Sequence, residues 1–309
     1  MRKIAAVLVM LFMLAGCSDT TELGDRAIIQ LAAVDFDGEE YKLNALLFSA
    51  GGTGGDLDVT KENVIKVTGS GKTLGEAVKQ LSLIDGKDIY MSESKLLVLG
   101  KGFEQADIIS VLTMLYKDMR CSLNMPVCCA EKAEMLTDMH FVEGITAAEK
   151  PYSMIDNAYY MGTSPKTTLL DILSANEGGR TVIIPHFAES ENGGGMTTNE
   201  DGKTAVINGS RLIELGKLGV FADEEETAGY MILSEGVDGV PMNFMLDEGE
   251  LTCEAYNIEI EFNGGGTPEI RASFRTRTGK KLTQEQQKQA QQELEDMAMA
   301  GLRLWAVSR

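Results

Sequence analysis

The first seventeen residues constrain the chain most, because they decide where the rest of it can fold. The basic start Met1-Arg2-Lys3 precedes an apolar run of eleven residues, Ile4 to Leu14. This run is well short of the roughly 20 residues that a helix needs to cross a bilayer. A basic start, a short apolar run and small residues after it are typical of a secretory signal. We therefore expect residues 1–16 to be removed and the body of the chain to fold in water after export.

The signal ends in Leu14-Ala15-Gly16-Cys17, which resembles the lipobox of bacterial lipoproteins. That resemblance implies a diacylglyceryl group on the sulfur of Cys17, and cleavage that makes Cys17 the first mature residue. Each buried methylene contributes about 0.8 kcal/mol, so two acyl chains are enough for stable residence in a membrane. The alternative is an ordinary secretory signal that ends near a cysteine by chance. We predict lipidation at Cys17 and an anchored protein on the extracytoplasmic face of a membrane.

The charge balance limits the classes of partner. The chain has 28 basic and 47 acidic residues, and its formal net charge is −19. The signal contains Arg2 and Lys3 but no acidic residue, so its removal shifts the net charge to −21. Nucleic acid and anionic lipid surfaces attract basic patches rather than acidic ones. We therefore predict no nucleic-acid partner, and contact with the membrane through the lipid anchor.

Cysteine and histidine are too few and too poorly spaced for a metal site. Beyond the signal the thiols are Cys121, Cys128, Cys129 and Cys253. Structural zinc needs four ligands, and only His140 and His186 could add to these thiols. Adjacent cysteines pair poorly, and no Cys-x-x-Cys frame is present. We interpret the thiols as small buried apolar groups. A disulfide from Cys121 to Cys128 or Cys129 stays open as an alternative, because disulfides form outside the cytoplasm.

Strand and helix patterns alternate through the first half of the chain. The turn residues Asp37-Gly38 separate two β-type runs, Ile28–Val34 and Tyr41–Phe48, which predicts a hairpin. Further strands are expected at Val64–Thr68, Lys95–Leu99, Leu123–Cys129 and Thr181–Ile184, where Pro185 ends the last, and a loop at Gly51–Gly55. Apolar spacing predicts helices over Thr73–Leu83, over Ile108–Leu115 and within Ala147–Leu173, interrupted at Gly162 and Pro165. This alternation is typical of an α+β fold with mixed sheets and packed helices.

The second half contains strand patterns and one long C-terminal helix. Strands are expected at Thr204–Asn208, Arg211–Glu214, Leu251–Phe262 and Ile270–Thr276, with turns at Asn208-Gly209-Ser210 and Gly264–Gly266. Helices are expected at Glu224–Leu233 and Thr283–Leu304, the second opening with Thr283 and Gln286 at capping-box spacing. The segment Glu189–Gly202 is rich in Asn, Gly, Glu and Asp, which is typical of a linker. We place the main domain boundary there, between an N-terminal part over residues 17–195 and a C-terminal domain over residues 196–309.

Three patterns invite a catalytic or nucleotide-binding interpretation, and none is complete. Gly69-Ser70-Gly71-Lys72-Thr73 ends like a phosphate loop, but the full frame needs glycine where Lys66 stands. We interpret it as a strand-to-helix turn, with Thr73 as N-cap and Glu76 completing a capping box. Neither histidine has a catalytic neighbourhood, and no G-x-S-x-G frame is present. The acidic run Asp223–Glu226 stands where a helix should begin, as the helix dipole favours. We predict no catalytic residue, no metal site and no cofactor, and hence no enzyme.

Several segments, taken together and in order, resemble the lipoprotein (C) subunit of spore germinant receptors. The first is the lipobox with Ser18-Asp19 and Glu22-Leu23, although the family usually has tryptophan where Ser18 stands. The second is Gly69–Leu74 with Glu76-Ala77, followed by Lys95–Gly100. The third comprises Gly202–Val206, Leu212, Gly216 and Leu218, then Glu225–Thr227 and Gly229. The segments keep their order over Cys17 to Leu304, which makes the set more specific than any one of them.

The resemblance implies a multi-domain α+β lipoprotein without a catalytic centre, on the outer face of the spore inner membrane. There it implies an accessory role beside integral membrane subunits of a receptor that responds to nutrient germinants. Family members usually continue past the long last helix into further sheet, so the C-terminal domain is expected to be truncated. A solute-binding lipoprotein of a membrane transporter is the alternative, since its size and anchor would be similar.

Overall fold

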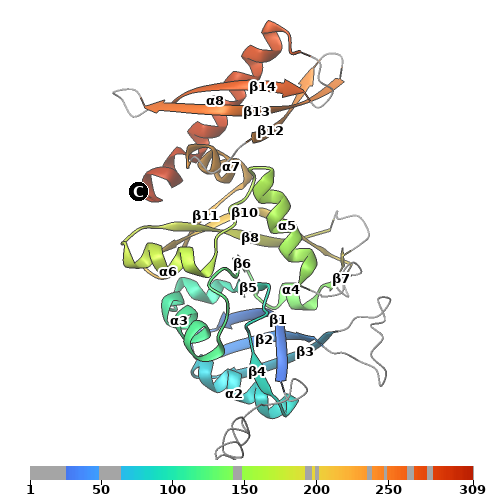
Figure 1. Ribbon diagram of the computed structural model, residues 1–309, viewed down its shortest axis with the longest axis vertical. Coiled ribbons are helices and arrows are strands. Elements are labelled where there is room, and N and C mark those ends of the chain that lie inside the picture. Colours follow the sequence, from blue (N-terminus) through green and yellow to red (C-terminus); the bar gives the residue numbers. More distant parts are fainter. Residues whose placement is uncertain are drawn as a thin grey trace, which may run out of the picture.

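The structure is a computed structural model that describes residues 26–48, 64–141, 148–191, 197–198, 202–234, 239–246, 249–262, 268–276 and 281–308. It combines a large mixed sheet, a smaller antiparallel sheet and helices that include a long one at the C-terminal end (Figure 1). The α+β fold class with mixed sheets is therefore confirmed. The loop expected at Gly51–Gly55 and the turn at Gly264–Gly266 lie outside the described residues.

The large sheet contains nine strands in the order β11-β10-β8-β6-β5-β1-β2-β3, with β4 beside β1. Their bounds are β1 (Arg26–Phe36), β2 (Tyr41–Phe48), β3 (Val64–Gly71), β4 (Asp88–Tyr90), β5 (Leu96–Leu99), β6 (Val127–Ala130), β8 (Val182–Ser190), β10 (Thr204–Glu214) and β11 (Lys217–Ala222). The predicted hairpin is formed by β1 and β2, and the Asp37 carboxylate accepts from the backbone N–H of Glu39 and Glu40, both at 2.9 Å. The central strands β1, β5, β6 and β8 run parallel, and antiparallel strands flank them on both sides.

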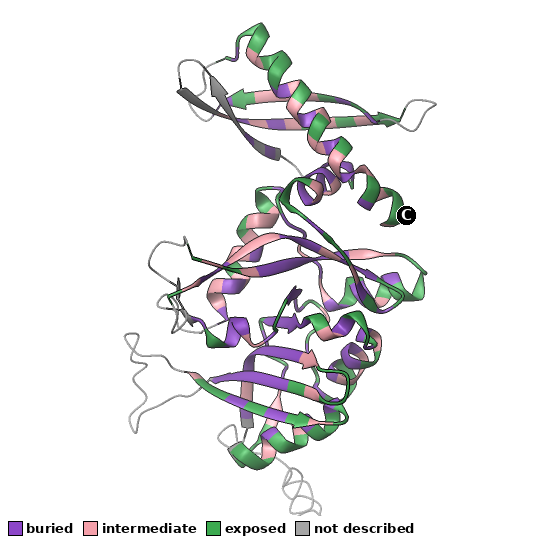
Figure 2. Ribbon diagram, turned by 180° about the vertical axis from the view of Figure 1, so that it is seen from behind, coloured by how far each residue is buried: buried purple, intermediate pink, exposed green. Residues whose placement is uncertain are grey.

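The parallel centre of this sheet is covered on both faces (Figure 2). Strands β5 and β6 are buried at every position, as expected of parallel strands between two helical layers. One face packs against helices α2 (Leu74–Asp85), α3 (Ile108–Met119) and α6 (Leu169–Glu177). The other face packs against α4 (Met135–Asp138) and α5 (Glu149–Tyr160). Short elements complete this part, namely the 3-10 helix η2 (Lys101–Glu104) and the paired strands β7 (His140–Phe141) and β9 (Thr197–Thr198).

The sheet departs from the sequence prediction at Pro185, which lies inside β8 instead of ending it. Proline has no backbone N–H to donate and is tolerated in a sheet at edges and bulges. Here Pro185 pairs with Ser210, next to a register shift in β10 between Ile207 and Ser210. The turn expected at Asn208-Gly209-Ser210 is this bulge, with φ of +133° at Gly209, and β10 continues through it.

The same pairing bears on the proposed division of the chain. β8 and β10 are neighbours in one sheet, so a boundary between residues 195 and 196 would separate paired strands. Instead, the buried side chains before and after about residue 223 belong to different hydrophobic clusters. From there on, buried side chains belong mainly to a cluster around the smaller sheet. We propose that the two structural units meet at the start of the next helix.

The C-terminal unit packs one long helix on a three-stranded sheet. It contains α7 (Glu224–Leu233), β12 (Gly239–Leu246), β13 (Gly249–Phe262), β14 (Pro268–Thr276) and α8 (Gln284–Ser308). Ala290, Leu294 and Ala298 of α8 are buried against Val240 and Ala255 of the sheet. The predicted capping box is present, because the Thr283 hydroxyl accepts from Gln286 N at 3.2 Å while Thr283 N donates to the Gln286 side chain at 2.9 Å. The strand β12 was not predicted.

Helices α7 and α8 touch through two glycines. A Cβ atom at Gly301 would lie 2.0 Å from the backbone nitrogen of Tyr230, and one at Gly229 would lie 1.9 Å from the carbonyl oxygen of Met297. Side chains would force these backbones apart. Beyond the crossing, Leu304 of α8 packs with Leu212 and Ala222 of the large sheet. This contact therefore joins the C-terminal unit to the rest of the molecule.

Candidate functional site

The predicted lipidation site, Cys17, lies outside the described residues. No helix within the described part of the chain is long and apolar enough to cross a membrane. Attachment through a lipid on Cys17 remains a prediction.

The Gly69–Thr73 segment is a strand-to-helix turn. Gly69 and Gly71 end β3 against α2, where a Cβ at Gly69 would lie 2.2 Å from the carbonyl oxygen of Ala77. Thr73 caps the helix by accepting from Glu76 N at 3.2 Å. The Glu76 carboxylate accepts from Lys72 N at 2.9 Å rather than from the cap residue, so half of the predicted capping box is replaced. The Glu76 carboxylate therefore occupies the backbone donor of Lys72, which a phosphate would otherwise use.

The other acidic candidate is also a helix start. Asp223 caps α7 and forms a capping box with Glu226, in which each side chain accepts from the backbone N–H of the other residue. The Glu226 carboxylate in addition pairs with Arg303 of α8 at 3.0 Å. Within the described residues, no group of three or more His, Cys, Asp or Glu side chains is placed to hold a metal ion.

His186 is a buried structural residue. Its Nδ1 lies 2.7 Å from the carboxamide oxygen of Asn208, and its ring meets Phe221 edge-on, with centroids 5.1 Å apart. Burial lowers the pKa of the imidazole, although the hydrogen bond to Asn208 opposes this effect. The nearby Arg211 guanidinium lowers it further, and itself pairs with Glu104 at 2.6 Å. The surroundings of the ring therefore favour its neutral form. For His140 the structure describes only the backbone, in β7.

The lowered pKa of His186 predicts a pH-dependent stability. Below the ordinary histidine pKa of 6.5, the unfolded chain binds a proton on this imidazole more readily than the folded protein does. The free energy of unfolding should therefore fall as the pH drops from 6.5 toward the pKa of His186 in the folded state. One proton gives a slope of at most about 1.4 kcal/mol per pH unit. We expect His186→Gln to flatten this part of the profile, measured by urea unfolding between about pH 7.5 and 5.5. Equal slopes for both proteins would contradict the assignment.

All four described thiols are buried and free. Burial raises the pKa of Cys121 and Cys253 to about 11 and raises that of Cys128 and Cys129 as well. The adjacent pair points to opposite faces of β6, because Cys128 belongs to one hydrophobic cluster and Cys129 to the other. The interpretation of the thiols as buried apolar groups is confirmed, and the alternative disulfides from Cys121 are absent from the structure.

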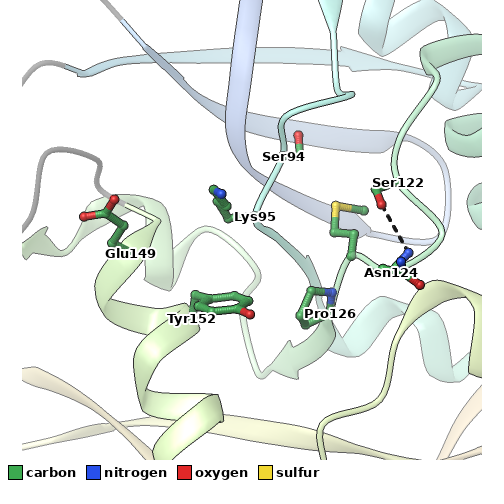
Figure 3. Close-up of a pocket in the computed structure, with 8 residues that line it drawn as sticks. Ser94, Lys95, Ser122, Asn124, Pro126, Glu149 and Tyr152 are labelled. Atoms are coloured by element: carbon green, nitrogen blue, oxygen red, sulfur yellow. Dashed lines mark hydrogen bonds between the residues drawn. The ribbon is translucent and has the colours of Figure 1, made fainter.

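Two cavities lie at opposite edges of the parallel strands. One, of about 390 Å³, is at the amino edge of β5 and β6, between those strands and α5 (Figure 3). Figure 3 shows the Lys95 side chain and the Tyr152 ring on its walls, while Ser122 accepts from Asn124 N at 3.2 Å. Lys166 holds Tyr152 in place by donating to its hydroxyl at 3.2 Å.

The second cavity, of about 430 Å³, is at the carboxyl edge of β1, where ligands commonly bind in α/β sheets. Its lining comes from the ends of β1 and β3, from β2 and from the segment after β6. The lining residues are Asp35, Phe36, Asp37, Glu40, Tyr41, Lys42, Asn44, Thr68, Ser70, Lys132 and Glu134. We call this set the carboxyl-edge cavity. The sequence prediction named none of these residues as a site. A feature of the sequence that points to this cavity is Asn44, a single polar residue inside the otherwise apolar run from Leu43 to Phe48.

Comparison with known proteins assigns the chain to a family. A family described as "Spore germination protein N-terminal domain" matches residues 19–189. Among solved structures, the crystal structure of the GerBC protein is similar to the chain, with 17% identity and a TM-score of 0.44. That similarity covers 87% of this chain and 79% of the other. No match was found among curated proteins. Since the family match extends over more than half of the chain, the protein belongs to the family of spore germination proteins that share this N-terminal domain.

Proposed function

We propose that the protein is a lipid-anchored, non-enzymatic accessory subunit of a nutrient germinant receptor. The observation that carries the proposal is the family match over residues 19–189. The lipobox-like segment Leu14–Cys17 supports the anchor. In this role Cys17 holds the body at the outer face of the spore inner membrane, and the folded surfaces contact integral membrane subunits. Because the anchor confines the protein to the membrane surface, it raises the effective concentration near those partners, and individually weak contacts suffice.

Affinity capture from detergent-solubilised membranes tests the proposal. The lipidated protein, tagged at its C-terminal end, would be captured separately from spores and from growing cells of its host, and its companions identified by mass spectrometry. We expect two polytopic membrane proteins to be enriched from spores, relative to an unrelated lipoprotein of the same host with the same tag. Any lipoprotein can share a detergent micelle with unrelated membrane proteins. The control lipoprotein measures this non-specific enrichment.

The alternative function makes a different prediction in the same experiment. A solute-binding lipoprotein would enrich a transporter permease and its ATPase, from growing cells as well as from spores. That result would leave the family match as evidence for the fold and would refute the receptor role. Enrichment of no membrane protein above the control lipoprotein would refute both.

A further inference from the structure

The carboxyl-edge cavity contains a buried polar group that the fold itself does not use. Asn44 lies on β2 and is only 1% exposed. Its carboxamide oxygen accepts from the Thr68 hydroxyl at 2.7 Å, but its Nδ2 has no hydrogen-bond partner within the described residues. Burying an unpaired amide opposes folding, and an apolar residue of the same shape would avoid this. This donor is buried, unpaired among the described residues and on the wall of a cavity, so an acceptor group of a ligand could satisfy it.

The charges of the cavity exclude an anion and a metal ion as the natural occupant. Four carboxylates line it (Asp35, Asp37, Glu40 and Glu134) against two ammonium groups (Lys42 and Lys132). An anion would therefore meet an excess of negative charge. Lys42 also pairs with Glu134, and its hydrogen bond lowers the pKa of that carboxyl. A metal ion at Glu134 would have to displace this lysine, and no three of the described carboxylates are placed to hold a metal ion together.

The acceptors of the cavity are held in place by backbone groups. The Asp35 carboxylate accepts from Phe36 N at 2.9 Å and from Ala133 N at 3.2 Å, which ties the end of β1 to the segment after β6. Gly100 packs against the same carboxylate, since a Cβ there would lie 2.1 Å from its Cγ. Carboxylates with spare lone pairs in a fixed position are suited to accept from a ligand's hydroxyl groups.

Three aromatic side chains pack behind the cavity, in the hydrophobic cluster on the other face of the large sheet. The rings of Phe36 and Tyr41 have centroids 4.8 Å apart, and Phe103 backs Tyr41 with a centroid distance of 6.4 Å. A Cβ at Gly102 would lie 1.7 Å from the carbonyl oxygen of Phe36, so the chain after β5 packs directly against the backbone at the end of β1.

We infer that the carboxyl-edge cavity binds a small, neutral, polyhydroxylated molecule of about monosaccharide size. Hydroxyl groups both donate and accept, so one molecule can accept from Asn44 Nδ2 and Lys132 while it donates to Asp35 and Glu40. A neutral ligand also avoids the charge excess that opposes an anion. The cavity volume of about 430 Å³ lies within the range of small-molecule sites. This inference concerns the cavity alone and does not depend on the receptor role.

Saturation-transfer NMR on the whole mature protein tests the inference, with myo-inositol and D-glucose as probes. We expect at least one of them to bind with a millimolar or lower dissociation constant. Asn44→Leu should weaken that binding at least about tenfold, which equals about 1.4 kcal/mol. The melting temperature of Asn44→Leu should be unchanged or higher, because the unpaired amide is removed. Lys132→Met, at an exposed position, should weaken binding severalfold. If Asn44→Leu fails to fold, this second variant still tests the inference.

Lys95→Met is the matched control, because it removes a lysine from the cavity at the amino edge. It should leave binding unchanged. The inference would be overturned if neither polyol binds, or if binding is unaffected by both Asn44→Leu and Lys132→Met. It would equally be overturned if inorganic phosphate, Mg²⁺ or L-alanine binds at Asn44 in preference to the polyols.

Discussion

Replacing Gly301 with alanine should destabilise the protein by about 3 kcal/mol or more, at the high end for an overpacked contact. The added Cβ would lie 2.0 Å from Tyr230 N and 2.1 Å from the carbonyl carbon of Gly229, and both are backbone atoms that cannot rotate away. The two helices would have to separate along their whole crossing. Separation would also loosen Leu304 from the large sheet. The C-terminal unit should therefore lose its attachment before the large sheet unfolds.

Urea unfolding followed by circular dichroism, together with limited proteolysis near residue 223, measures this effect. Gly75→Ala is the matched control, because Gly75 is also helical but a Cβ there would meet no atom closer than 3.9 Å. That variant should be as stable as the wild type, or more stable by up to about 1 kcal/mol, since alanine favours helix. Arg303→Ala removes only the exposed ion pair with Glu226 and should cost less than about 1 kcal/mol. A Gly301→Ala protein as stable as these controls would contradict the close contact.

Replacing Cys17 with alanine should abolish lipid attachment and, with it, function at the membrane. The lipobox-like segment needs the Cys17 sulfur as the acceptor of the diacylglyceryl group, and two acyl chains contribute about 0.8 kcal/mol for each buried methylene. The strongly acidic body, with a net charge of −19 for the whole chain, should not bind anionic lipid by itself. Without the lipid, the mature protein should therefore leave the membrane.

Two measurements separate lipidation from signal cleavage. Intact mass and incorporation of a labelled fatty acid should show the lipid on the wild type and on a Cys253→Ala control, but not on Cys17→Ala. Because an uncut signal could itself retain Cys17→Ala, a second variant replaces residues 1–17 with a cleavable signal without cysteine. That protein should be found in the soluble fraction. A labelled Cys17→Ala protein would refute the site, and full germination with the soluble variant would refute the need for an anchor.

Local patterns in the sequence were enough to predict many of the elements. The turn at Asp37-Gly38, the cap at Thr73 and the capping box at Thr283 lie where they were expected, because each depends on residues within four positions of one another. The helix start at Asp223 follows the same rule. The resemblance to germination lipoproteins likewise rested on short ordered segments, and the family match over residues 19–189 agrees with it.

The tertiary structure decided what depends on residues far apart in the chain. The pairing of β8 with β10 makes Pro185 part of a strand, because the bulge in its partner removes the need for a proline N–H. The amide of Asn44 is buried without a partner because β3 and the segment after β6 lie beside it in the folded protein. Nothing in the local sequence distinguishes Gly301 from another helical glycine, and only its contact with α7 shows why a side chain does not fit there. The sequence by itself thus determined many of the elements, several of their caps and the family. The strand order, the cavity and the helix contact came from packing between distant segments, which no local periodicity specifies.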